Sequence, residues 1–103
     1  MPYITQNYRD ELDALIDAFA DKVNEIHARN PEQTRDGLLN YSVTRILNKT
    51  FPDARYHDYN EIIGFLECCK LEYYARKVAP YEILKAQQNG EVQTFNKGDV
   101  KGY

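Results

Sequence analysis

The chain has 103 residues, of which 16 are acidic and 13 basic, so its formal net charge at pH 7 is −3. This length fits one domain, and 43 % hydrophobic with 28 % charged residues is typical of a folded globular chain rather than a disordered one. No apolar run is long enough to span a bilayer, and the N-terminus lacks the pattern of a secretion signal. The negative charge also argues against general nucleic-acid binding, which needs many Lys and Arg side chains at phosphates. We therefore expect a cytoplasmic protein whose partners are neither membranes nor nucleic acids.

A first helix is predicted over residues 6–29. Its apolar residues recur at spacings of three and four along one face: Tyr8, Leu12, Leu15, Ile16, Phe19, Val23 and Ile26. Aspartates occupy the opposite side of this helix. Asn30-Pro31 ends the helix, because the residue before a proline disfavours the helical conformation. Pro31 can then begin a short helical turn of its own.

A second helix is predicted from Leu38 to Lys49, with Asp36 as its N-cap. It has a wide apolar face formed by Leu38, Leu39, Val43, Ile46 and Leu47. The Phe51-Pro52-Asp53 segment then ends the helix and begins a polar loop that runs to His57.

A third helix is predicted from Asp58 to Gln88. Asp58 and Glu61 have the spacing of a capping box, and Gly90 would supply a left-handed cap at the other end. Pro80 lies inside this helix and should kink or break it, because proline removes a backbone hydrogen bond. The sequence thus predicts an all-α fold of three main helices, with one helical domain over residues 1–90. Residues 91–103 would form an extended arm or a disordered tail.

The predicted third helix has two apolar faces. At 100° per residue, one arc holds Ile62, Phe65, Leu66, Cys69, Tyr73 and Ile83. A second arc holds Ile63, Leu71, Tyr74, Val78 and Tyr81. Because two shorter helices can cover one of these faces well and the other poorly, we expect the chain to form a homo-oligomer, with a dimer as the simplest case.

Two charged residues fall among these apolar positions. Arg76 lies in the first arc, and Glu67 lies in the second with Lys70 three residues further on. In one interpretation their stems pack while the charged heads reach solvent or pair with each other. In the other they line a polar pocket or a subunit interface, with Tyr74 and Tyr81 as stacking walls. The candidate ligand or interface residues are therefore Glu67, Lys70, Tyr74, Arg76 and Tyr81.

Few residues point to chemistry. No nucleophile elbow, phosphate-binding loop or zinc-protease motif is present, so neither catalysis nor a cofactor is indicated. Cys68 and Cys69 are adjacent and lack further ligands at metal-binding spacing, so we interpret them as packing or inert thiols. The His57-Asp58 pair is interpreted as a solvated loop dipeptide. A small enzyme whose site is shared between subunits remains an alternative.

Three stretches of the chain form a distinctive set. They are Met1–Ile4 (MPYI), Leu39–Thr44 (LNYSVT) and the run from Tyr59 to Glu82, followed by Asn89-Gly90-Glu91-Val92. Together they resemble a family of short proteins that are common in bacteriophage and prophage genomes. The chain departs from the family pattern at Ala75, where an arginine pair loses its first member. The resemblance covers most of the chain and implies a phage-type origin and hence a bacterial cytoplasm. It also marks a set of motif positions: Glu67, Lys70, Glu72, Arg76, Tyr81 and Glu82.

These observations favour a non-enzymatic binding protein that occupies a host protein or assembles into an oligomer. The acidic side of the first helix suits a protein partner. The alternative is a protein that sequesters an anionic small molecule such as a nucleotide signal. In that case Arg76 would bind phosphate and Tyr74 or Tyr81 would stack on the base.

Overall fold

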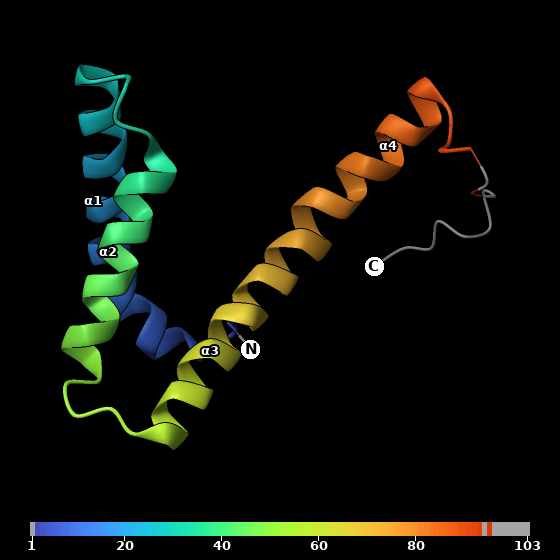
Figure 1. Cartoon of the computed structure of the whole chain (residues 1–103). Helices are drawn as coiled ribbons and strands as arrows, with labels where there is room; N and C mark the ends of the chain where they lie inside the picture. The colour runs from blue at the N-terminus through green and yellow to red at the C-terminus, as the bar shows by residue number, and fades with distance from the viewer. Residues whose placement is uncertain (1, 94, 96–103) are drawn as a thin grey trace. The chain divides into compact units, whose positions relative to one another are not determined.

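A computed structural model, which describes residues 2–93 and 95, shows three helical segments (Figure 1). The first two are α1 (Gln6–Arg29) and α2 (Arg35–Thr50). The third consists of α3 (Tyr56–Tyr73), a π-helical turn η1 (Tyr74–Val78) and α4 (Ala79–Asn89). No strand occurs in the described residues, so the predicted all-α fold with a long third helix is confirmed.

The chain divides into two compact units, one of residues 2–62 and one that begins at Ile63. The division falls within α3, inside the segment that the sequence predicts as one helical domain. Within the described range, no helix is both long and apolar enough to cross a membrane.

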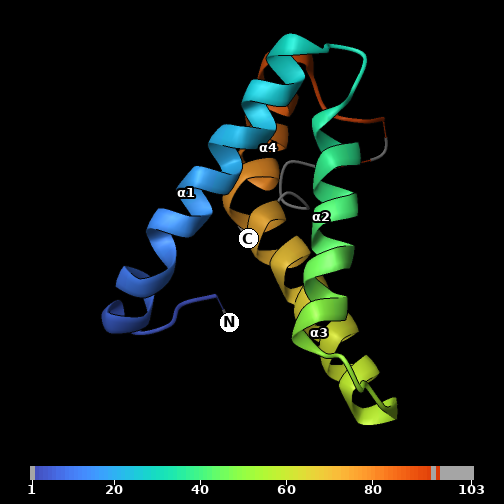
Figure 2. The same cartoon turned by 90° about the vertical axis from the view of Figure 1, so that its left-hand side faces the viewer.

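In the unit of residues 2–62, α1 and α2 form a helical hairpin. The two helices are closest at the turn that joins them and diverge away from it (Figure 2). Accordingly, Val23 near the turn is buried, whereas Leu15 and Ile16 in the middle of α1 are exposed. The hairpin therefore leaves much of the apolar face of α1 uncovered by α2.

The connection between α1 and α2 holds a single turn and no helix. The Gln33 N–H donates to the Asn30 carbonyl at 2.9 Å and closes a four-residue turn with Pro31 at its second position. The Gln33 carbonyl in turn accepts from His27 Nδ1 at 2.8 Å. The end of α1 and the turn are thus held together by one side-chain hydrogen bond.

The N-terminus of α2 corrects the predicted cap. Thr34, not Asp36, is the N-cap, and its hydroxyl oxygen accepts from the Gly37 N–H at 3.3 Å. Asp36 instead lies in the first helical turn. A hydrogen bond from the Thr34 hydroxyl and further bonds from the Gly37 and Asp36 N–H groups lower the pKa of Asp36.

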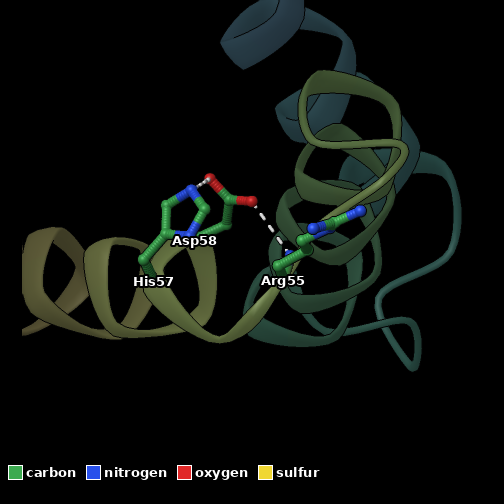
Figure 3. A network of polar contacts seen from close by, with 3 residues as sticks. All are labelled: Arg55, His57 and Asp58. Carbon is green, nitrogen blue, oxygen red and sulfur yellow. Dashed lines mark hydrogen bonds and ion pairs between the residues drawn. The ribbon is translucent and has the colours of Figure 1, made fainter.

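The third helical segment begins at Tyr56, two residues before the predicted capping box. Figure 3 shows Asp58 between the Arg55 backbone and the His57 ring. The Arg55 N–H donates to Asp58 Oδ2 at 2.9 Å, and the Arg55 carbonyl accepts from Tyr59 N–H at 2.9 Å. Asp58 is therefore the acidic third residue of the first turn rather than its cap. His57, whose Nε2 lies 3.4 Å from Asp58 Oδ1, is on the helix and not in a loop.

The π turn is the structural response to Pro80. Proline has no N–H, and in a regular α-helix its ring would collide with the carbonyl four residues earlier. Here the Ala79 N–H bonds to the Tyr74 carbonyl five residues back, and Pro80 lies in the first turn of α4. The helix is thus disturbed near Pro80, as predicted, but by a π turn that ends at Val78 and not by a break.

The helix ends at Asn89, one residue beyond the predicted Gln88, and Gly90 is its C-cap. Gly90 has φ 91° and ψ 153°, a backbone conformation that essentially requires glycine but is not the left-handed helical one. Beyond it the Phe95 N–H donates to the Val92 carbonyl at 2.9 Å. The expected arm or disordered tail otherwise lies largely outside the described residues, which omit 94 and 96–103.

Candidate functional site

The five candidate residues all lie on the third helical segment, in the unit that begins at Ile63. Glu67 and Lys70 are on α3, Tyr74 and Arg76 are in the π turn, and Tyr81 is on α4. The helix therefore spaces them along its axis rather than gathering them at one point.

The two anomalous charges pair with different partners. Glu67 Oε1 lies 3.0 Å from Lys70 Nζ, three residues further along α3. Arg76 Nε donates to Glu72 Oε1 at 3.1 Å, one turn back. The Arg76 side chain is 71 % exposed, whereas that of Glu72 is 30 % exposed. The carboxylate that positions this guanidinium is thus Glu72, a motif position that was not among the five candidates.

The two candidate tyrosines present partly exposed rings. Tyr74 is 42 % and Tyr81 is 54 % exposed. Lys85 Nζ lies 5.6 Å from the centroid of the Tyr81 ring, within the range of a cation–π contact. Arg76, Lys77 and Lys85 also give this half of the segment a positive charge, which is partly offset by Glu82.

The π turn changes which side chains share a face. A π turn takes about one residue more than an α turn, so later side chains are rotated back by roughly 100°. Lys77, near the end of the turn, then takes the angular position that an unbroken helix gives to Arg76. Tyr81 and Leu84 likewise come into line with Phe65, Cys69 and Tyr73. Helical periodicity in the sequence does not show this shift, because it places each side chain at a constant rotation of 100° from the one before.

Cys68 and Cys69 are free thiols, as expected, but both are exposed rather than packed in a core. Among the residues that the structure describes, no three His, Cys, Asp or Glu side chains are grouped so that they could hold a metal ion.

The sequence reasoning missed a polar face of α2. An open hollow of about 500 Å³ is lined by Gly37, Asn40, Tyr41, Thr44, Arg45 and Asn48. The Thr44 hydroxyl donates to the Asn40 carbonyl at 2.8 Å, and Tyr41 is 67 % exposed. The signal was present in the LNYSVT stretch, because residues 40, 41 and 44 share one face of a helix.

The helical fold and this distribution of residues can be compared with known families. A family model described as "Domain of unknown function (DUF6899)" matches residues 1–92. The chain belongs to this family. Membership covers all three helical segments, including the five candidate residues and the polar face of α2. No curated protein and no solved structure matches the chain.

Proposed function

We propose that this DUF6899 member is a phage-encoded, non-enzymatic protein that acts in the bacterial cytoplasm by occupying a protein of the host. The resemblance of three sequence stretches to short phage and prophage proteins supports the phage origin. The binding mode rests on one observation, the exposed apolar face of α1.

Five large apolar side chains of α1 are between 39 % and 68 % exposed: Tyr8, Leu12, Leu15, Ile16 and Phe19. Together they present roughly 500 Å² of mostly apolar surface, near the upper end for a monomeric protein. Such a face, at spacings of three and four, is the arrangement by which an amphipathic helix docks into an apolar groove.

The net charge of α1 indicates the chemistry of the partner. α1 carries six acidic residues, namely Asp10, Glu11, Asp13, Asp17, Asp21 and Glu25. They outnumber its Lys and Arg residues, which are Arg9, Lys22 and Arg29. Because the aspartates lie on the side opposite the apolar face, they act through the net negative charge of α1, which favours a partner whose apolar groove lies in a positively charged surface.

The test compares variants of the full chain in a lysate of the bacterial host. Leu15→Arg places a charge at the centre of the exposed face without disturbing a buried position. Leu71→Arg makes the same change on α3, where Leu71 is 56 % exposed. We expect the wild type and Leu71→Arg to retain one host protein and Leu15→Arg to lose about tenfold or more of it. The purified host protein should then bind the wild type directly in calorimetry.

Equal retention by Leu15→Arg and the wild type would contradict binding through α1. A small molecule released from the denatured protein, together with the absence of a retained host protein, would instead favour the anion-sequestering alternative. That alternative draws on Arg76, Lys77 and Lys85 next to Tyr74 and Tyr81.

A further inference from the structure

An exposed strip of apolar side chains runs along the third helical segment and continues across the π turn. With the rotation introduced by that turn, it consists of Phe65, Cys69, Tyr73, Tyr81 and Leu84, here called the π-turn strip. All five residues lie in the unit that begins at Ile63. In an unbroken α-helix Leu84 would lie roughly 100° from Phe65 and Tyr81 roughly 120° from Cys69, so the π turn brings both back into line with the first half of the strip.

The strip is large enough for a modest interface. Phe65 is 41 %, Tyr73 65 %, Tyr81 54 % and Leu84 49 % exposed, and Cys69 is also exposed. These side chains expose roughly 400 Å² of surface per chain. With the aliphatic parts of the side chains that border the strip, two copies would bury about 1,000 Å² in total, the lower bound for a specific interface.

The residues of the strip are arranged symmetrically about the π turn. If two copies run antiparallel with residue 75 at the centre, Phe65 lies opposite Leu84 to within one residue. Cys69 lies opposite Tyr81, and Tyr73 opposite Lys77. A two-fold axis makes each of these contacts occur twice, as in other isologous dimers.

The charges next to the strip favour an antiparallel over a parallel arrangement of the two copies. Lys77 lies on the strip between Tyr73 and Tyr81, so in a parallel pair it would face Lys77 of the second copy. In the antiparallel pair it faces Tyr73 and is within one residue of Glu72, which gives it a ring face and a carboxylate as partners. Glu72 would likewise face Glu72 in a parallel pair. Charge complementarity therefore selects the antiparallel arrangement.

We propose that the π-turn strip binds a second copy of the same chain in an antiparallel, two-fold symmetric dimer centred on the π turn. The interface is distinct from the α1 face to which the host protein is assigned. The dimer does not depend on that function.

The first test reverses the charge at Lys77 and at Glu72 in two separate variants. Lys77→Glu and Glu72→Lys each place like charges opposite one another, and each should weaken the dimer by about tenfold or more. An equimolar mixture of the two variants restores both pairs and should dimerise as the wild type does. Lys49→Glu, the same change of charge on α2, is the matched control and should have no effect. Sedimentation at about 1–200 μM gives the masses, and circular dichroism verifies that each variant stays helical.

A wild-type monomer across this range would overturn the proposal and would mean that the strip is covered within the chain or by another protein. A dimer that Lys77→Glu leaves intact would overturn it equally.

The second test determines whether the two copies run antiparallel or parallel. With Cys68→Ser, the remaining Cys69 thiols of antiparallel copies are about 18 Å apart along the axis, too far for a disulfide. Adding Tyr81→Cys places a thiol opposite each Cys69, so mild oxidation should yield a covalent dimer in this double variant. Rapid cross-linking of Cys68→Ser alone would show a parallel pair and contradict the proposed arrangement.

Discussion

Arg76 Nε donates to Glu72 Oε1 across 3.1 Å, one turn back along the same helical segment. This contact accounts for a charge that periodicity places among apolar residues. The π turn moves Arg76 away from that face, and the guanidinium binds the mostly buried side chain of Glu72. Lys77 takes the vacated position. The chemistry of this face is thus set by a backbone irregularity rather than by the order of residues alone.

Arg76→Met should therefore have a small effect on stability. Because the side chain is 71 % exposed, losing its ion pair should change the free energy of unfolding by about 1 kcal/mol or less. Urea unfolding followed by circular dichroism measures this change, with Glu72→Gln as the matched variant. A loss of more than about 2 kcal/mol would show that the guanidinium is desolvated in the assembled protein. Calorimetry of the wild type against a nucleotide panel separately tests whether Arg76 binds an anion.

Pro80→Ala should stabilise the helix and weaken the dimer at the same time. Alanine restores an N–H donor and removes the ring that disfavours a regular helix, a local gain of up to about 3 kcal/mol. With that constraint removed, η1 can close as an α turn, which rotates Leu84 by about 100° away from Phe65 and Tyr81 by about the same angle away from Cys69. We expect higher helix content in circular dichroism and a higher dimer dissociation constant in sedimentation. An unchanged dissociation constant would show that the π turn persists without Pro80 or that the strip is not the interface.

Much of this fold is encoded in local sequence signals. The bounds of α1 follow from its apolar period and from Pro31, and the end of α4 follows from Gly90, because each of these signals acts on a few neighbouring residues. The starts of α2 and α3 were less predictable. Asp36 and Asp58 both look like caps, yet each lies inside its helix. A cap depends on which side chain reaches a free N–H, and several polar residues compete for that position.

The candidate site also could not be predicted in full from local sequence signals. Tyr74, Arg76 and Tyr81 were selected on one constant helical rotation, which holds up to Tyr73 and fails in the π turn that follows. Pro80 signals a disturbance, but not whether the helix kinks, breaks or takes up an extra residue. The partners of Glu67 and Arg76 then follow from spacings of three and four along the helix.

Thr34→Ala tests the observed cap of α2. The Thr34 hydroxyl oxygen accepts from the Gly37 N–H, and removing it leaves that donor to water. The loss should be about 0.5–2 kcal/mol in the free energy of unfolding, measured by urea titration. Thr34→Ser keeps the oxygen and should retain most of the stability. If both variants are equally destabilised, the methyl group rather than the hydrogen bond is responsible.

Asp36→Asn should make stability less dependent on pH in the acid range. The hydrogen bonds from Thr34 and from backbone N–H groups lower the pKa of Asp36 in the folded chain, so folding favours its ionised form. This contribution is fully present above the ordinary aspartate pKa of about 3.9 and is lost as pH falls through the lowered value. The pKa of Glu25, lowered mainly by a hydrogen bond from Lys22, acts in the same direction and remains in the variant. Melting temperatures at a series of pH values from about 2 to 7 measure the difference, with Asp53→Asn as a matched loss of one carboxylate. The wild type should lose more stability on acidification than Asp36→Asn does, and parallel curves would show that Asp36 is not engaged at the cap.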